Sequence, residues 1–378
     1  MTPTVSIVVP CYNAERTILQ ALQSLQIQTL KDWEAVVVID GASDRSAQLA
    51  RELGLQDPRI RMIEQDNQGL AAARNAGISS VGGEFICFLD ADDVLLPTML
   101  ETLVHKFGQS HQFGAIYCGW IQSDPELRDR SWVVAPTCEG RLFHQLSHRN
   151  LFPCHSIMLR RETLENVGFF DCTLKHCHDW DLWTRVARTG LCFGCVHEPL
   201  VIYRMVPHSL SRTPRSFFDA GREVILRAHA PDDRVLHALP EFADGCACNP
   251  DRPLAEWAIS CVGHALSIGD VEAAHDLFEE VRKMRGEPTT PADTAGIVPS
   301  LWFGAGVPYG SWEQLWARVG RSLLRFLVEQ EERLNRPGFA MQTLDEIVGQ
   351  SRCPGPERAI SVLRRIVKAK VHSWRRWF

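Results

Sequence analysis

Over roughly the first 110 residues, short apolar runs alternate with segments whose apolar positions recur at helical spacing. Val5–Val9 is a β-branched run that ends at Pro10, and Trp33–Ile39 is a second run that is almost entirely apolar. A continuous apolar run of this kind fits a strand that is buried on both faces. Strands that alternate with helices predict a mostly parallel α/β sheet. The further elements expected here are strands over 60–63 and 85–89 and helices over 15–28, 44–53 and 70–79.

The pattern changes further along the chain. Between residues 99 and 205 it is mixed, with strands expected over 114–120, 155–159 and 195–203 and a helix over 179–189. From Phe217 onward the periodicity is helical, without a convincing strand. The best helix candidates are 254–268, 270–284, 312–334, 341–350 and 356–376. We therefore predict two domains, an α/β domain over residues 1–215 and a mainly α-helical accessory domain over residues 216–378.

Composition and charge narrow the function classes. The chain has 378 residues, of which 45% are hydrophobic and 23% charged, and this excludes a disordered, collagen-like or coiled-coil protein. A net charge of -6 provides no basic field, so we expect no nucleic-acid partner. No apolar run approaches ~18 residues and no signal peptide is recognisable, so we expect a cytoplasmic protein. The thirteen cysteines are odd in number, and free thiols are expected.

Polar segments follow each of the first four expected strands. In an open parallel sheet, ligands bind at the carboxyl ends of the strands, so these segments should meet at one edge. Each segment alone also fits an ordinary loop with helix-capping residues, and the coincidence of all four carries the argument. The four segments are 10–13, 40–44, 67–69 and 90–93.

The segment after the fourth strand carries the sharpest chemical signal. Asp90-Ala91-Asp92 places two carboxylates two residues apart, and such oxygen ligands suit Mg²⁺ or Mn²⁺. A metal of this kind takes substrate phosphates as further ligands and stabilises the charge on a departing phosphate. A lone Asp-x-Asp is common, and an acidic helix cap before Pro97 is the alternative interpretation.

Residues 4 to about 211 resemble a family 2 glycosyltransferase with a GT-A fold, a Rossmann-like sheet for nucleotide-diphospho-sugars. The resemblance implies an inverting, metal-dependent transferase that moves a sugar from a nucleotide sugar to an acceptor hydroxyl. The acceptor would be a polysaccharide, a lipid-linked or envelope glycan, or a protein glycan. The segments that carry the resemblance, in family order, are 5–13, 40–44, 67–69 with 73–75, 90–93 and 179–183.

The resemblance also implies a role for individual residues. Asp40 matches the acid that binds the nucleotide base, and a carboxylate accepting from a pyrimidine imide favours uracil and hence a UDP-sugar. Asp92 matches the metal ligand for Mn²⁺ or Mg²⁺, with Asp90 and His208 as further candidates. Asp179 matches the general base, although a helix cap for 180–189 fits the local sequence equally well. The residues implied for the nucleotide sugar are Pro10, Tyr12, Glu15, Asp40, Gly69, Arg74 and Asp90.

Two positions depart from the family pattern. Ile39 stands where paired acids are common, so one acid is lost and Asp40 is kept. His178 precedes Asp179 where the family usually has Glu. A cationic or hydrogen-bonding histidine there would lower the basicity of Asp179 or reorient it.

The last segment, residues 358–378, is basic and amphipathic and ends in aromatic residues. A helix of this kind can lie on an anionic membrane surface. For a cytoplasmic protein this would be a peripheral contact with the inner face of the membrane. A solvated helix packed on its own domain explains the pattern equally well.

Other functions stay open at this point. A nucleotidyltransferase would need a Gly-rich basic signature that residues 12–15 do not supply. A catalytically weak nucleotide-sugar-binding or scaffold protein is the non-enzymatic alternative. Cysteines and histidines over 172–178, with Cys192 and Cys195, are irregularly spaced, which favours buried thiols over a zinc site. Fold alone does not identify the acceptor.

Overall fold

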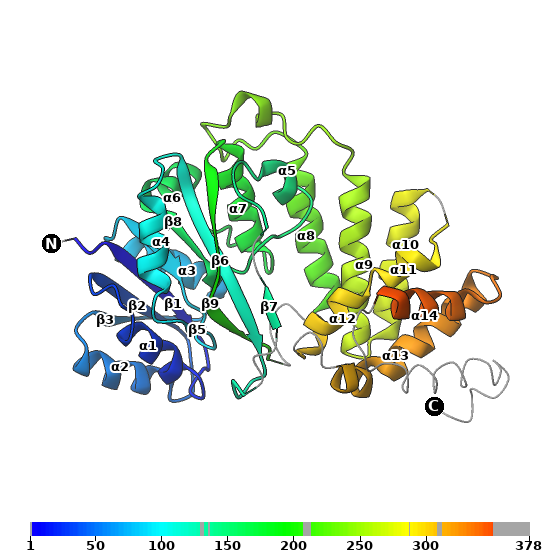
Figure 1. Ribbon diagram of the computed structural model, residues 1–378, viewed down its shortest axis with the longest axis horizontal. Coiled ribbons are helices and arrows are strands. Elements are labelled where there is room, and N and C mark those ends of the chain that lie inside the picture. The colour runs from blue at the N-terminus through cyan, green and yellow to red at the C-terminus, as the bar shows by residue number, and fades with distance from the viewer. Residues whose placement is uncertain are drawn as a thin grey trace. The chain divides into compact units, whose positions relative to one another are not determined.

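The computed structural model describes residues 2–128, 132–134, 137–206, 213–286, 288–307 and 312–350 (Figure 1). The chain divides into two compact units. Unit 1 comprises Met1–Ser123, Val133–Arg204 and Glu223–Cys248, and unit 2 comprises Asp124–Trp132, Met205–Arg222 and Asn249–Phe378. The division passes through helix α8 (Pro214–Ala228), and the domain border expected at residue 215 stays a prediction.

A mixed β-sheet forms the framework of unit 1. Its strand order is β3-β2-β1-β4-β8-β6-β9-β5, and β7 pairs with β6. Strands β1 to β4 are mutually parallel, whereas β8 runs antiparallel to both β4 and β6. The strands are β1 (Val5–Cys11), β2 (Trp33–Asp40), β3 (Ile60–Gln65), β4 (Phe85–Phe88), β5 (Val94–Leu95), β6 (Phe113–Ser123), β7 (Trp132–Val134), β8 (Ile157–Arg160) and β9 (Cys192–Arg204).

Strands β1, β2 and β4 are buried along both faces, whereas β3 lies at the edge of the sheet and is only partly buried. Val8 of β1 lies opposite Val36 of β2 and Phe88 of β4, and all three side chains are fully buried. Continuous apolar runs are therefore required here, in place of the alternating pattern of a half-exposed strand. The predicted mostly parallel α/β sheet is confirmed.

Helices cover both faces of the sheet. On one face, Ile7 and Val9 belong to the same buried cluster as residues of α1 (Ile18–Gln26), α2 (Ser46–Gln56) and α4 (Met99–Phe107). On the opposite face, α3 (Leu70–Ser80) packs so closely that a Cβ on Gly77 would clash with Val8. The remaining helices of the first 200 residues are α5 (Phe143–Leu146), α6 (Arg161–Val167) and α7 (His178–Arg188), with a 3₁₀ turn at Cys154–Ser156.

Unit 2 has a helical core of its own. Phe278, Trp302 and Phe326 are among its buried side chains. The described residues from 213 to 350 form no strand, which confirms the predicted helical C-terminal region. The helices are α9 (Asp251–Ser267), α10 (Val271–Arg285), α11 (Pro291–Ala295), α12 (Val298–Ala305), α13 (Trp312–Arg333) and α14 (Phe339–Gln350).

Most predicted helices of unit 2 are present, and two short ones were missed. They are α11 and α12, which lie between the predicted helices 270–284 and 312–334. A capping box explains why α11 forms. The Thr290 hydroxyl accepts from the Asp293 amide, and the Asp293 carboxylate accepts from the Thr290 amide. The basic helix expected over 356–376 lies outside the described residues. Among the described residues, no helix is both long and apolar enough to span a membrane.

Candidate functional site

The four polar segments singled out in the sequence lie along one edge of the sheet. Each follows the carboxyl end of β1, β2, β3 or β4, and the parallel pairing of these strands places those ends side by side. The expected convergence is therefore present. Arg74, Asp90 and His178 are joined across this edge by hydrogen bonds.

The loops after β1 and β2 are tied together by hydrogen bonds. The side-chain oxygen of Asn13 accepts from the Ser43 amide at 2.9 Å, and the Glu15 amide donates to Asp44 at 2.9 Å. Glu15 in turn accepts from the backbone amide of Arg45 at 3.2 Å. Tyr12 is 55% exposed in this setting, whereas Pro10 is buried inside the β1–β2 pair. Tyr12 is therefore accessible to a ligand, and Glu15 helps to shape the loop.

Asp40, at the end of β2, fastens the beginning of α3. Its carboxylate accepts from the backbone amides of Gln68 at 2.8 Å and Gly69 at 2.9 Å, and from the Gln65 side chain at 2.8 Å. Gly69 adopts a φ of 88°, a value that side-chain-bearing residues rarely adopt. The glycine therefore lets its own amide turn toward Asp40. The predicted contact of Asp40 with a nucleotide base stays a prediction.

A buried arginine connects the Asp-rich turn with α7. Arg74 Nη2 donates to Asp90 Oδ1 at 2.6 Å, and Arg74 Nη1 lies 2.8 Å from His178 Nε2. Because a guanidinium can only donate, His178 Nε2 accepts and the ring is neutral. Burial and the nearby Arg74 lower the pKa of His178 to about 3. His178 is therefore not the cation that would weaken Asp179 as a base.

Asp90 and Asp93 each have a cationic partner. Burial acts to raise the pKa of Asp90, but Arg74 and His155 outweigh it and hold the pKa below its ordinary value. His155 Nδ1 lies 2.7 Å from Asp93 Oδ2 and 3.6 Å from Asp90 Oδ2. Burial opposes the charge on His155, yet Asp93 and Asp90 raise its pKa to about 10. Sequence reasoning missed His155, because no local motif marks it.

Asp92 differs from its two neighbours in the turn. Among the described residues, no side chain donates a hydrogen bond to the Asp92 carboxylate or forms an ion pair with it. Burial, together with Asp93 and Asp90, raises the pKa of Asp92 to about 8. A carboxylate in this situation lacks a positive partner, which suits a divalent cation.

The same turn offers a second set of metal-binding atoms. One ligand atom each from Asp90, Asp93 and His155 lie within 4.8 Å of one another, and Asp92 does not belong to that set. Asp93 and His155 already neutralise each other, and Asp90 is paired with Arg74, so Asp92 is the carboxylate of this turn that fits a cation best. The third predicted candidate, His208, lies outside the described residues. The cysteines and histidines over 172–195 form no metal-binding group in the part of the chain that the structure describes.

Asp179 lies in the first turn of α7, which begins at His178. Cys177, the residue before the helix, adopts a left-handed φ of 57°. Asp179 Oδ1 accepts from the Trp180 amide at 2.8 Å, and its Oδ2 accepts from the Asn150 side chain at 3.3 Å. Burial raises the pKa of Asp179 above its ordinary value. Sequence reasoning missed Asn150, a single polar residue in a loop that no pattern distinguishes.

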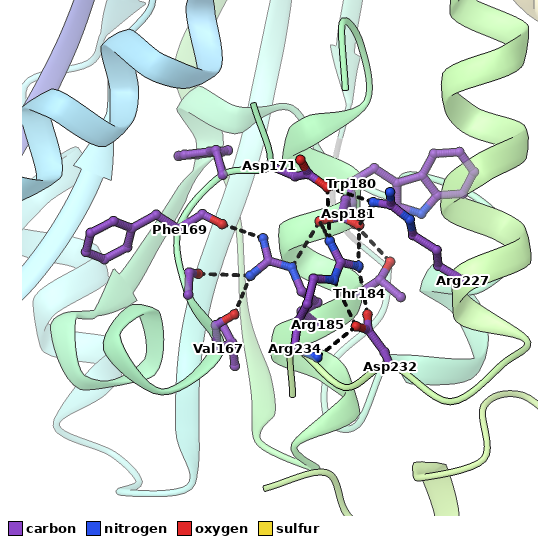
Figure 2. A network of polar contacts seen from close by, with 12 residues as sticks. Val167, Phe169, Asp171, Trp180, Asp181, Thr184, Arg185, Arg227, Asp232 and Arg234 are labelled. Carbon is purple, nitrogen blue, oxygen red and sulfur yellow. Dashed lines mark hydrogen bonds and ion pairs between the residues drawn. The ribbon is translucent and has the colours of Figure 1, made fainter. Parts of the chain in front are cut away.

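A network of arginines and aspartates holds α7 in place (Figure 2). The buried Asp181 pairs with Arg185 at 3.0 Å, with Arg234 at 2.9 Å and with Arg227 at 3.3 Å. Asp171 also pairs with Arg227, at 2.8 Å. Asp181 is two residues from Asp179, so this network fixes the helix turn that carries the predicted base.

Known sequences resemble this chain over its first part. The sequence model described as Glycosyl transferase family 2 matches residues 6–168. EpsH of Bacillus subtilis (strain 168) is 43% identical over 241 residues, which cover 58% of this chain and 66% of EpsH. The uncharacterized glycosyltransferase EpsJ of the same strain is 33% identical over 223 residues, which cover 57% of this chain and 64% of EpsJ. The chain thus spans slightly less than two thirds of the length of either relative.

Solved structures share the fold. Staphylococcus aureus TarS 1–349 in complex with UDP-GlcNAc aligns with a TM-score of 0.52 and 18% identity, over 98% of this chain and 93% of that one. The mannosyltransferase PcManGT from Pyrobaculum calidifontis, in complex with GDP-Man and Mn²⁺, aligns with a TM-score of 0.50 and 18% identity, over 88% and 89%. At this identity the likeness concerns the fold, which is of the GT-A type. Residues 6–168 of the chain are thus similar to glycosyltransferase family 2.

Proposed function

We propose that this protein is an inverting glycosyltransferase that moves a sugar from a nucleotide-diphospho-sugar to an acceptor hydroxyl. The observation that carries the proposal is a pair of carboxylates in different states at one edge of the sheet. Asp92 lacks a positive partner among the described residues, and Asp179 has a pKa that burial raises. The first suits a cation bound to a diphosphate, and the second suits a proton acceptor.

The donor is held by the loops after β1, β2 and β3. Tyr12 is exposed enough to contact the base or ribose, Pro10 is proposed to line the same pocket, and Glu15 shapes the loop. Asp40 keeps a free acceptor position on its Oδ2 for an imide N–H, which favours a uracil base. Gly69 lets the backbone approach the donor closely. A UDP-sugar is therefore the proposed donor, and the UDP-GlcNAc complex of TarS supports this choice.

The leaving diphosphate lies against the Asp-rich turn. Asp92 with Asp90 would hold Mn²⁺ or Mg²⁺, which when bound offsets the negative charge of the diphosphate. Arg74 keeps Asp90 ionised and in position. The Mn²⁺ complex of PcManGT supports the choice of a divalent ion.

Asp179 acts on the acceptor. The acceptor oxygen attacks the anomeric carbon and forms the new glycosidic bond while the bond from that carbon to the phosphate oxygen breaks. The acceptor proton passes to Asp179, and the nucleoside diphosphate leaves on the opposite face, so the anomeric configuration inverts. A pKa above the ordinary aspartate value makes Asp179 a better proton acceptor. Its bond to Asn150 orients the carboxylate.

The acceptor is proposed as a glycan or a lipid-linked sugar, in polysaccharide or envelope synthesis. The similarity to other bacterial glycosyltransferases supports this class. The alternative, a nucleotide-sugar-binding scaffold without transfer activity, is less favoured because Asp90, Asp92 and Asp179 are all present.

A donor screen tests the proposal. The full chain is titrated with a panel of UDP-, GDP-, CMP- and dTDP-sugars, with and without Mn²⁺, and both binding and slow release of the free nucleotide are measured. We expect Mn²⁺-dependent binding of a UDP-sugar. If none of these donors bound, the transferase proposal would be abandoned. Binding without donor hydrolysis or transfer to any offered glycan acceptor would favour the scaffold alternative.

A further inference from the structure

Two histidines and two cysteines gather in unit 1, in a cluster that the proposed reaction does not use. One ligand atom each from His144, His148, Cys246 and Cys248 lie within 4.8 Å of one another. We propose that these four residues form a structural Zn²⁺ site. The inference does not depend on the proposed glycosyltransferase activity, because none of the four belongs to the donor or acceptor site.

The first pair of residues is placed by one helical turn. His144 lies in α5 and His148 four residues later, a spacing that brings two side chains to the same face. Their ring centroids are 4.6 Å apart. The Trp180 indole donates to the carbonyl of Leu146 at 2.6 Å, which anchors this turn to α7. Both imidazoles are therefore presented together from a fixed piece of backbone.

The second pair is placed by a glycine. Gly245 has a φ of 94°, and a Cβ there would lie 2.6 Å from backbone atoms of His229 and Ala230. The chain can therefore run directly against the end of α8, where the Cys246 amide donates to the Ala228 carbonyl at 2.9 Å. Cys248 Sγ then lies 3.1 Å from His148 Nε2 and 2.9 Å from Cys246 Sγ.

The ligand chemistry selects the metal. Two thiolates and two imidazoles form a set typical of closed, tetrahedral zinc sites, whereas Mg²⁺ and Ca²⁺ prefer oxygen ligands. With Zn–S bonds of about 2.3 Å, two thiolates on a tetrahedral zinc lie about 3.8 Å apart. The two thiols lie 2.9 Å apart and all four ligand atoms lie within 4.8 Å of one another, so small side-chain movements suffice to enclose the ion.

Neighbouring groups support the ligands in the way that outer contacts support zinc sites. His229 Nδ1 lies 2.7 Å from the Ile225 carbonyl, which can only accept, so this nitrogen carries the proton. His229 Nε2 then faces Cys248 Sγ at 3.3 Å.

A disulfide between Cys246 and Cys248 is the rival interpretation. Both cysteines are free thiols in the structure. A disulfide gives no role to His144 and His148, and its formation would need an external oxidant to remove two electrons and two protons. Zinc uses all four side chains and needs no redox partner. The metal would also fix the segment that leads to Asn150, two residues after His148.

The first test measures metal in the unmodified protein. The full chain is purified without chelator or added metal, and its zinc content is determined by mass spectrometry. We expect about one zinc per chain. Replacement of zinc by Co²⁺ is expected to give the intense visible bands of a tetrahedral ion and a thiolate charge-transfer band in the near ultraviolet. Absence of zinc together with a mass 2 Da below that of the reduced chain would establish the disulfide and overturn the proposal.

Single variants test the ligand set. Cys246→Ser, Cys248→Ser and His144→Ala are each expected to lose at least about nine tenths of the bound zinc, since each removes one of four ligands. Cys172→Ser is the matched control, because Cys172 is an exposed free thiol outside the cluster. Circular dichroism checks that each variant is folded. Retention of full zinc by folded His144→Ala, or loss of zinc in Cys172→Ser, would contradict the assignment.

Discussion

At the residue scale, Asp92 is the carboxylate of the Asp-rich turn that no described side chain neutralises. Asp90 pairs with Arg74 and Asp93 pairs with His155, so both already have a cationic partner. The raised pKa of Asp92 reflects the cost of adding a third buried negative charge to the same turn. In the proposed function, a cation at Asp92 would remove that cost and so link donor binding to metal binding.

This difference leads to a prediction for Asp92→Asn. The variant is expected to bind Mn²⁺ at least ~10-fold more weakly and to lose Mn²⁺-dependent donor binding, because the unneutralised carboxylate is gone. Isothermal titration with Mn²⁺, and then with a UDP-sugar, measures both effects. Glu52→Gln on α2 is a matched acid-to-amide control and should bind Mn²⁺ as the unchanged protein does. Equal Mn²⁺ affinity in Asp92→Asn would assign the metal to Asp90, Asp93 and His155 instead.

Asp179 leads to a second prediction at this scale. Asp179→Asn keeps the shape of the side chain and can still accept from the Trp180 amide, but it cannot take a proton. The transfer rate is expected to fall by ~10²–10⁴-fold with donor affinity unchanged. Single-turnover transfer and donor titration separate the two quantities. A rate within a factor of about two of the unchanged protein would remove Asp179 as the base.

At the element scale, α7 is held by a buried network of ion pairs and hydrogen bonds. Asp181 is 2% exposed and accepts ion pairs from Arg185, Arg227 and Arg234 (Figure 2). Arg185 additionally donates to the backbone carbonyls of the segment before α7, including that of Phe169 at 2.5 Å. The helix start that carries Asp179 is therefore held from several directions.

Removing the centre of this network should destabilise unit 1. Asp181→Ala leaves three arginines without their shared counter-ion, and breaking a buried pair in this way costs about 3–5 kcal/mol. Urea unfolding followed by tryptophan fluorescence measures the loss. Glu64→Gln removes an exposed pair with Arg51 and should change stability by no more than about 1 kcal/mol. A similar small effect for Asp181→Ala would show that the network contributes little to folding.

The same network has a defined pH dependence. Burial acts to raise the pKa of Asp171, but hydrogen bonds from Thr173 and Arg227 outweigh it and lower the pKa to about 2 from an ordinary value of 3.8. The folded pKa is the lower one, so this stabilisation is complete above about pH 4 and is lost as the pH falls through about 2. As the pH falls from about 4 to about 2, the temperature of the unfolding midpoint should decrease in both proteins. The decrease should be smaller in Asp171→Asn than in the unchanged protein. Parallel curves for the two proteins would contradict the assignment.

At the scale of the whole molecule, the sequence predicted those features that depend on local pattern. Buried parallel strands require continuous apolar runs, and parallel pairing alone brings their polar ends together, so the site edge followed from the chain. His155, Asn150 and Arg204 could not be predicted in the same way. Each meets its aspartate across a separation that no spacing rule covers, from 29 residues for Asn150 to 111 for the Arg204 amide and Asp93.

The same reasoning explains the cysteine and histidine cluster. His148 and Cys248 are 100 residues apart, and the cysteines meet the histidines only because α8 returns to the end of α5. The spacings His-x-x-x-His and Cys-x-Cys are present in the sequence, whereas the cysteines and histidines over 172–195 form no metal-binding group among the described residues. Spacing within a motif predicts metal ligands well only when all of them come from one segment.

The pairing of β6 with β9 has a consequence for the order in which the protein folds. The strands are parallel and join residues about 80 positions apart, so their contact closes a long loop of chain. Arg204, the last residue of β9, donates its amide to Asp93 and its side chain to the Asp92 carbonyl. The Asp-rich turn therefore reaches its final shape only when this late, non-local pairing is complete. A chain still being synthesised would carry the parallel strands β1 to β4 long before the proposed metal site at their edge is complete.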